Sequence, residues 1–384
     1  MTLSAANPSA LGALAASFAD TSAKLYLRPL ALVSGEAAEA AIAAGEARRL
    51  AGGRLAFTIC EVTFRDGGRA ESVLAAVADL LDWVPSRDDE TAARVRDRLE
   101  AIAAPRPPFA GLPLDCAPGR GPLVMGIVNV TPDSFSDGGQ WLDPEAAVDH
   151  GKGLLEAGAD IVDVGGESSR PGAEPVAEDE ELRRVLPVVR GLASAGALVS
   201  IDTRHARVMA AALEAGARII NDVTALTGDA NSLQVAASSG APVVLMHMQG
   251  EPRTMQDDPA YDDAPLDIYD YLEDRVGVCA AAGLTRTRIA VDPGIGFGKT
   301  PRHNSEILGR LSLYHGLGCG LLLGASRKRF VAGFSRGEPP EKRLPGSLAA
   351  GLAALDQGVQ ILRVHDVAET RQAIAVWDAP HAHS

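Results

Sequence analysis

Polar side chains follow the short apolar runs that recur between residues 123 and 365. Each run is rich in Val, Ile and Leu, and each is followed by residues that hydrogen-bond or carry charge. The residues in these positions are Asn129, Asp163, Gly165-Gly166-Glu167, Asp202, Asn221-Asp222, His247, Asp292, Ser326-Arg327-Lys328, Arg363 and His365. A single Asp or Asn at a strand end often only caps the next helix. Because nearly every run ends this way, we expect these side chains to line one site.

The chemistry of these residues divides into two groups. One group offers hydrogen-bond acceptors that suit the N–H edge of a flat, nitrogen-rich ring: Asp202, Asn221 and Asp292. The other group is cationic or can become so, and suits a phosphate or diphosphate: Arg170, Lys328, Arg363 and His365. The loop at 165–172 is rich in glycine and hydroxyl groups and also suits phosphate oxygens. A substrate with a ring at one end and a diphosphate at the other fits both groups.

Three features of the same segments suggest other kinds of site: a nucleotide-binding loop, a Schiff-base lysine and a metal site. Residues 294–300 end like a nucleotide-binding Walker A loop, but that motif needs glycine where Pro293 stands. Lys328 lies between two arginines that could lower its pKa, so a Schiff-base lysine stays open as an alternative. His247 is expected to pack at a strand end, and no His, Asp and Glu set has the spacing of a zinc site.

The apolar runs alternate with helical stretches, which predicts parallel strands joined by helices. The strands are expected at residues 123–128, 160–164, 198–201, 218–220, 242–246, 288–291, 320–323 and 359–364. Gly158, Gly216 and Gly240 follow three of the helices, as left-handed C-caps do. Eight strand–helix units favour a closed (β/α)8 TIM barrel over an open doubly wound sheet, and a barrel carries its chemistry at the C-terminal strand ends.

A Pro- and Gly-rich break at residues 104–122 separates a smaller unit from the barrel. We therefore expect two α/β domains, an accessory domain at 1–118 of unknown role and a catalytic barrel at 119–384. In the first, strands are expected at 25–33 and 54–64. Its helices are expected at 37–50, 70–81 and 89–103.

The composition of the chain indicates where the protein is located and which classes of partner it disfavours. The 384 residues are 46% hydrophobic and carry a net charge of −14, which disfavours nucleic acid and anionic membranes as partners. The four cysteines are scattered without a CxxC pair, as in a reducing compartment. No signal peptide and no run long enough to span a bilayer is recognised. A cytoplasmic protein that binds small molecules is expected.

Eight segments, in order along residues 125–366, together resemble the dihydropteroate synthases. They are MGIVNVTPDSFSDGG at 125–139, DVGGESSRPG at 163–172, SIDT at 200–203, IIND at 219–222, LMHMQG at 245–250, DPGIGFGK at 292–299, SRK at 326–328 and RVHD at 363–366. The resemblance implies a transferase of folate biosynthesis. In its reaction the amine of 4-aminobenzoate attacks the methylene of dihydropterin-methyl diphosphate, giving 7,8-dihydropteroate and diphosphate.

The resemblance also implies roles for residues at matching positions. Asn129 would contact Mg²⁺ held on the diphosphate. The diphosphate would be bound by Ser169, Arg363 and His365. The pterin would be held by Asp202, Asn221, Asp292 and Lys328. The aminobenzoate site would be shaped by Arg170, Pro171, Phe297 and Ser326. Met246 and Val364 complete the expected substrate-binding set, and a homodimer is expected.

The expected catalytic residues are Lys328, Arg363 and Asp202. The carbon–oxygen bond beside the electron-rich ring can break early, so the methylene gains cationic character. Acidic groups near the pterin would stabilise this charge, while Mg²⁺ and Arg363 would stabilise the departing diphosphate. The attacking amine is neutral at pH 7 and needs no protein nucleophile. Loop closure would exclude competing water.

The sequence departs from the family pattern in three ways, and two alternative functions stay open. Ser169 keeps the hydroxyl but lacks the methyl of the Thr common in the family, and Ile295 and Ala325 lie at variable positions. The first 120 or so residues lie outside the resemblance. A pterin-dependent corrinoid methyltransferase would share the barrel and the acids but would not need the cationic set. A non-catalytic pterin-binding subunit is the other alternative.

Overall fold

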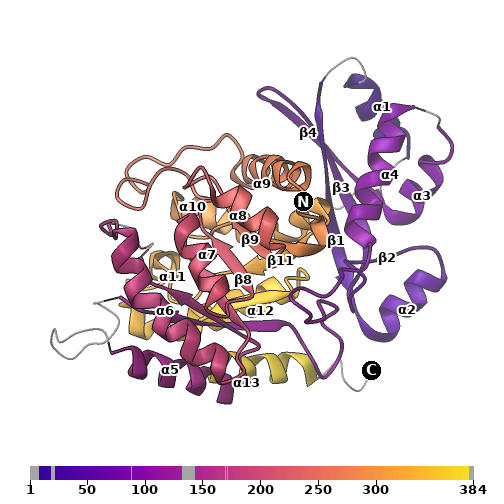
Figure 1. The fold of residues 1–384 in the computed structure, drawn as a ribbon. Helices are drawn as coiled ribbons and strands as arrows, with labels where there is room; N and C mark the ends of the chain where they lie inside the picture. Colours follow the sequence, from indigo (N-terminus) through magenta and orange to yellow (C-terminus); the bar gives the residue numbers. More distant parts are fainter. Residues whose placement is uncertain are drawn as a thin grey trace.

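The computed structural model describes residues 8–18, 22–87, 89–131, 143–168, 170 and 172–379. An antiparallel sheet with its helices stands beside a closed parallel barrel (Figure 1). The barrel order is β10-β11-β12-β5-β6-β7-β8-β9. The closed barrel confirms the expected fold and rules out the open doubly wound sheet.

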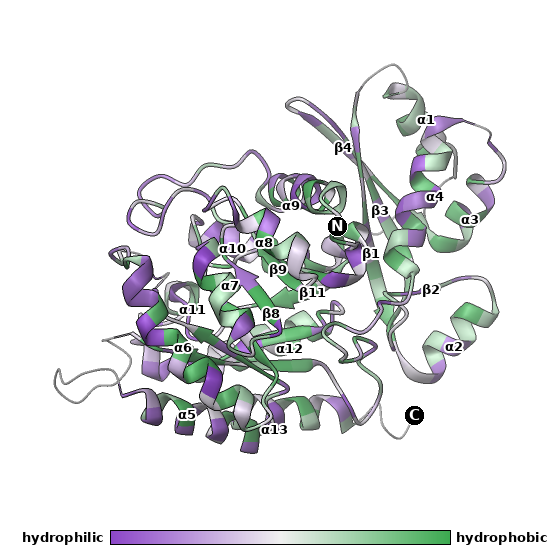
Figure 2. Ribbon diagram, in the orientation of Figure 1, coloured by the Kyte–Doolittle hydropathy of each residue, from purple (hydrophilic) through white to green (hydrophobic). Residues whose placement is uncertain are grey.

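All eight expected barrel strands form, each beginning within two residues of its expected start. They are β5 (Leu123–Asn129), β6 (Ile161–Gly165), β7 (Val199–Asp202), β8 (Ile219–Asp222), β9 (Val243–Met246), β10 (Ile289–Asp292), β11 (Gly320–Leu323) and β12 (Ile361–Val364). Their residues are buried almost throughout, because helices cover the outer face and side chains fill the inside. Figure 2 shows the apolar character of β8 and β9 against the more hydrophilic residues of the outer helices.

The outer layer consists of helices that follow the strands in order. They are α5 (Pro144–Glu156), α6 (Glu178–Ser194), α7 (Ala206–Glu214), α8 (Ser232–Ser239), α9 (Ala264–Ala281), α10 (Pro301–Leu308), α11 (Arg329–Phe334), α12 (Leu344–Leu355) and α13 (Val367–Asp378), with short 3₁₀ turns η2 (Arg286–Arg288), η3 (Leu311–Leu317) and η4 (Pro340–Lys342). Gly158, Gly216 and Gly240 have φ of 101°, 115° and 65°, which confirms the expected left-handed helix ends. No helix in the described ranges is long and apolar enough to cross a bilayer.

The Pro- and Gly-rich segment between the two domains closes the N-terminal end of the barrel. Phe109 and Leu114 are 1% and 4% exposed. They pack with inward-facing strand residues such as Leu123, Ile219 and Ile361. Since this end of the barrel is filled by apolar side chains, polar chemistry has room only at the opposite rim.

The N-terminal domain is a four-stranded antiparallel sheet with helices on one face. Its elements are α1 (Pro8–Ser17), β1 (Lys24–Val33), α2 (Gly35–Ala43), β2 (Arg48–Arg49), β3 (Ala56–Asp66), β4 (Arg69–Ala76), α3 (Val77–Trp83) and α4 (Glu90–Ala103). The strand expected at 25–33, the strand expected at 54–64 and the helix expected at 89–103 are present.

Two expected helices of this domain are wrong in part. The helix expected at 70–81 is a strand as far as Ala76. Gly67, at φ 56°, turns the chain so that β4 pairs with β3 from Asp66↔Arg69 onward. Helix-favouring residues such as Ala70 are overridden by this pairing. The helix expected at 37–50 ends at Ala43, because Gly45 takes φ 75° and the chain then adds the short strand β2.

Candidate active site

Side chains from β6, β7, β8 and β12 meet at the C-terminal rim of the barrel. Arg363 donates from Nε to Asp163 Oδ2 at 2.6 Å and from Nη2 to Asp202 Oδ2 at 2.7 Å. Asn221 Nδ2 donates to the same Asp163 oxygen at 2.9 Å. The guanidinium of Arg363 and the amide of Asn221 therefore connect side chains from four different strands.

Burial and charge shift the protonation of this cluster. The pKa of Asp202 is raised to about 7, chiefly because the carboxyl is buried; Arg363 opposes the rise and Asp163 adds to it. The second oxygen of Asp163, Oδ1, is buried and has no hydrogen-bond partner among the described residues. An N–H donor on a bound ring would satisfy that oxygen, and a buried unpaired acceptor is costly to leave empty.

A second part of the cluster lies on β10 and on the segment after β11. Burial lowers the pKa of Lys328 to about 8, with Asp292 opposing the shift. Burial also raises the pKa of Asp292, with Lys328 as the strongest opposing charge. A Cβ built on Gly324 would stand 3.5 Å from Asp292 Oδ2 and 3.7 Å from Lys328 Nζ. Gly324 therefore lies beside both groups and beside Arg363, whose Cβ would be 3.9 Å from the added atom.

Lys328 also links the rim to the loop that carries Phe297. Its ammonium donates to Ile295 O at 2.5 Å and lies 4.4 Å from the centre of the half-buried Phe297 ring. Buried Met246 at the end of β9 lies opposite Asp292 in the strand pairing. These contacts place Lys328, Phe297 and Met246 at one side of the rim.

Ser326 and His365 lie at the other side of the barrel rim. Ser326 Oγ lies 3.0 Å from His365 Nδ1 and accepts the His365 N–H at 3.2 Å. Burial, followed by the charge of Arg363, lowers the pKa of His365 to about 3. The lowered pKa favours the neutral imidazole of His365 at pH 7. Val364 lies between Arg363 and His365, half-buried.

Some expected residues are not joined to the cluster by the described contacts. Arg170 is exposed on its loop. Ser169 and Pro171 lie outside the described residues, so their expected roles stay predictions. Asp222 accepts the N–H groups of Thr224 and Leu226 at 2.7 and 3.0 Å, so it organises the turn after β8.

His247 and Lys299 form a separate buried pair. Lys299 Nζ lies 2.9 Å from His247 Nδ1 and also donates to Phe297 O at 2.9 Å. Burial lowers the pKa of both groups. His247 thus packs at its strand end, as the sequence indicated, and Lys299 fixes the backbone beneath Phe297.

Asn129 could contact a Mg²⁺ ion that is held mainly by the substrate. Asn129 ends β5 at the same rim and is half-buried. The described part of the chain holds no group of three or more His, Cys, Asp and Glu residues suited to a metal. Mg²⁺ commonly keeps its waters and is held by one or two protein oxygens together with substrate phosphates. A single amide oxygen fits a Mg²⁺ ion that arrives on a diphosphate.

The sequence assigned no role to two residues of the site. Asp163 was recognised as a strand-end acid, but only the structure gives it the central position between Arg363 and Asn221. Gly324 had no sequence signal beyond its place directly after an apolar run. Inward-pointing Asp163 within β6 could have been found from the alternation of side chains along a strand.

Comparisons with known proteins agree with this geometry. The family model described as "Pterin binding enzyme" matches residues 125–365. The dihydropteroate synthase of Escherichia coli K12 is 46% identical over 259 residues, which are 67% of this chain and 91% of that protein.

Solved structures of dihydropteroate synthases are also similar to this chain. Xanthomonas albilineans dihydropteroate synthase with 4-aminobenzoic acid is 47% identical, with a TM-score of 0.67 over 72% of this chain and 98% of that one. The same enzyme in complex with 7,8-dihydropteroate is 44% identical, with a TM-score of 0.64 over 72% of this chain and 99% of that one. The barrel rim, the family match and these relatives together show that the chain belongs to the dihydropteroate synthase family of pterin-binding transferases.

Proposed function

We propose that the barrel joins 4-aminobenzoate to (7,8-dihydropterin-6-yl)methyl diphosphate and releases diphosphate. The observation that carries this proposal is the set of three acids near Gly324: Asp163 and Asp292, which are buried, and Asp202, whose side chain is 14% exposed. An aminopyrimidine edge offers the N–H donors that such acceptors need. The cations Lys328 and Arg363 lie beside the same glycine and suit the diphosphate end.

In the free protein, Arg363 occupies two of these acceptors. Its guanidinium holds Asp163 and Asp202 in place and neutralises charge that burial would otherwise make costly. A bound pterin would supply its own N–H donors to the carboxylates. Arg363 would then be free to turn toward the diphosphate, so substrate binding itself would prepare the group that stabilises the leaving anion.

The remaining roles follow from position. Asp202 and Asp292 would stabilise positive charge that develops at the methylene. Neutral His365, held by Ser326, would donate a hydrogen bond to a phosphate oxygen without adding charge. Asn129 would contact Mg²⁺, which supplies charge neutralisation to the diphosphate when bound.

Product formation tests this function. Purified protein, both substrates and Mg²⁺ should give dihydropteroate and diphosphate in equal amounts, and Arg363→Ala should be far slower. Arg302→Ala is a matched control, because Arg302 is an exposed arginine on the surface of α10 that pairs with Glu306. Pterin binding without product would point to a non-catalytic subunit instead. Turnover of methyl-tetrahydrofolate with a corrinoid would point to a methyltransferase.

We also propose that the protein is a cytoplasmic homodimer. The twelve residues of α12 include no charged side chain, yet only Ala354 and Leu355 are buried. Phe334 on α11 and Val376 on α13 are 57% and 71% exposed. A second copy could cover this surface of barrel helices. Light scattering should give twice the chain mass, and Val376→Glu should lower it. The four unpaired cysteines agree with a reducing compartment.

A further inference from the structure

The N-terminal domain is fixed to the barrel by buried contacts. Tyr26 on β1 is 1% exposed, packs edge-on against Tyr269, and donates its hydroxyl to both oxygens of Asp270 on α9 at 2.9 and 3.0 Å. Ser312 Oγ in η3 donates to Pro29 O at 2.8 Å. Buried polar contacts of this kind hold a single arrangement, so the domain is a rigid support for α9 and η3.

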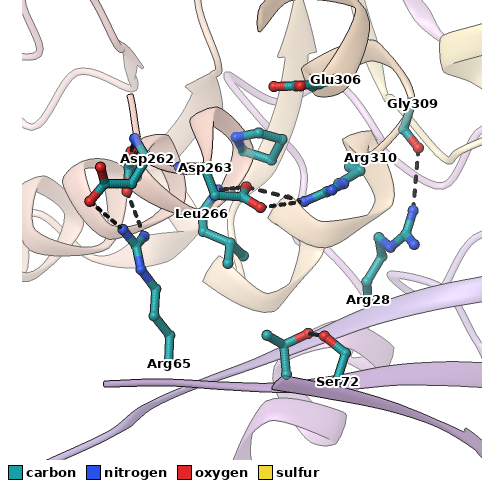
Figure 3. A network of polar contacts seen from close by, with 12 residues as sticks. Arg28, Arg65, Ser72, Asp262, Asp263, Leu266, Glu306, Gly309 and Arg310 are labelled. Atoms are coloured by element: carbon teal, nitrogen blue, oxygen red, sulfur yellow. Dashed lines mark hydrogen bonds and ion pairs between the residues drawn. The ribbon is translucent and has the colours of Figure 1, made fainter. Parts of the chain in front are cut away.

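One arginine of this domain reaches the start of α9. Arg65, near the end of β3, donates to Asp267 Oδ1 at 2.5 Å and lies 3.6 Å from Asp262 Oδ2. The other Asp267 oxygen accepts the N–H of Asp262 at 2.9 Å and that of Asp263 at 3.3 Å. Arg65 therefore fixes a carboxylate that in turn holds the chain as it enters the helix. Figure 3 shows Arg65 directed at this turn from the strands of the N-terminal sheet.

A second set of contacts supports the same turn. Asp263 caps α9 by accepting the Leu266 N–H at 3.2 Å, and Arg310 holds its carboxylate at 2.9 and 3.1 Å. Arg28 on β1 donates to Gly309 O at 3.4 Å, directly beside Arg310 (Figure 3). The N-terminal domain thus contacts the entrance of α9 directly through Arg65 on β3, and β1 contacts the residue beside Arg310.

The segment before this turn reaches the substrate loops. In residues 247–263, the Tyr261 hydroxyl donates to Gly298 O at 2.8 Å, and Gln256 Nε2 donates to Gly296 O at 2.6 Å. Both acceptors are neighbours of Phe297. Pro252 O accepts the N–H of Gly172, two residues after Arg170, at 2.9 Å. This segment therefore lies between the two loops expected to shape the aminobenzoate site.

From these contacts we infer that the N-terminal domain positions the aminobenzoate side of the active site, with Arg65 as the positioning residue. The path runs from Arg65 through Asp267 and the backbone at Asp262 to Tyr261, and from there to the loop of Phe297. Arg65 touches no substrate in this arrangement. The inference rests on the proposed function for the identity of the substrate, but the path itself is independent of it.

The test compares Arg65→Met with Arg98→Met in the full chain. Arg98 is a matched control, because it also joins the N-terminal domain to α9, by a 2.5 Å pair with Glu273, but at a point remote from the turn. Arg65→Met should raise KM for 4-aminobenzoate about five- to tenfold, with KM for the pterin diphosphate changed less than about twofold. Arg98→Met should change neither, and Arg65→Lys should recover part of the loss.

Hydrogen exchange supplies a readout that does not need turnover. Peptides from residues 247–263 should exchange faster in Arg65→Met than in the wild type or in Arg98→Met. Unchanged exchange in Arg65→Met, or an equal rise of KM in Arg98→Met, would overturn the inference. If the wild type made no dihydropteroate, the proposed function would fall, while the exchange comparison would still decide whether Arg65 holds the segment.

Discussion

Replacing Arg363 with methionine should destabilise the protein in a pH-dependent way. Arg363 neutralises Asp163, which is fully buried, and Asp202, whose side chain is 14% exposed. Removing one member of a buried pair costs about 3 kcal/mol or more of the free energy of unfolding. Methionine keeps much of the side-chain volume, so the loss should come from the two carboxyl groups left without their cationic partner.

The sign of the pH dependence follows from Asp202. Its pKa in the folded protein is raised to about 7. The folded state therefore keeps a proton that the unfolded chain loses above about pH 4. Stability falls as pH rises through this window and becomes level above pH 7. Without Arg363 the folded pKa of Asp202 moves higher, so Arg363→Met should lose up to about 1.4 kcal/mol between pH 7 and 8, where the wild type loses only about 0.4 kcal/mol.

Urea denaturation followed by circular dichroism at pH 6, 7 and 8 measures this difference. A double variant with Asp163→Asn should recover part of the lost stability at pH 8, because it removes one carboxylate while keeping an acceptor for Asn221. If the wild type and Arg363→Met lost stability in parallel from pH 6 to 8, or if the double variant recovered nothing, the charge argument would be refuted.

Three further outcomes are expected. Gly324→Ala should leave the melting temperature nearly unchanged, since its methyl meets Asp292 and Lys328 at 3.5 and 3.7 Å, but calorimetry should show pterin binding weakened about tenfold or more. Tyr26→Phe should lower the free energy of unfolding by about 1–2 kcal/mol in urea titration, because Asp270 then loses the hydroxyl that donates to both of its oxygens. EDTA should stop turnover, and Mg²⁺ should restore it, with no change in circular dichroism, since the described residues hold no structural metal cluster.

The barrel was predictable because its signals are local and repeated. Each strand is a short apolar run bounded by turn residues, and Gly158, Gly216 and Gly240 marked helix ends correctly. The N-terminal sheet was harder. The segment around Ala70 has helix-favouring composition, but β3 offers it a full set of antiparallel partners. Pairing across a hairpin depends on the neighbouring strand, which composition does not encode.

For the site, the sequence alone indicated the rim at which the polar side chains lie, because the C-terminal ends of barrel strands converge there. Tertiary structure alone decided how they pair. Arg363 was expected at the diphosphate, but in the free protein the nearest buried charges are Asp163 and Asp202, and it joins them. Only the folded chain brings Arg65 to Asp267, 202 residues away, and so links the N-terminal domain to the substrate loops. Residue types and their spacing indicate which side chains could bind or react. Ion pairs between distant segments depend on tertiary packing, which a local sequence pattern does not predict.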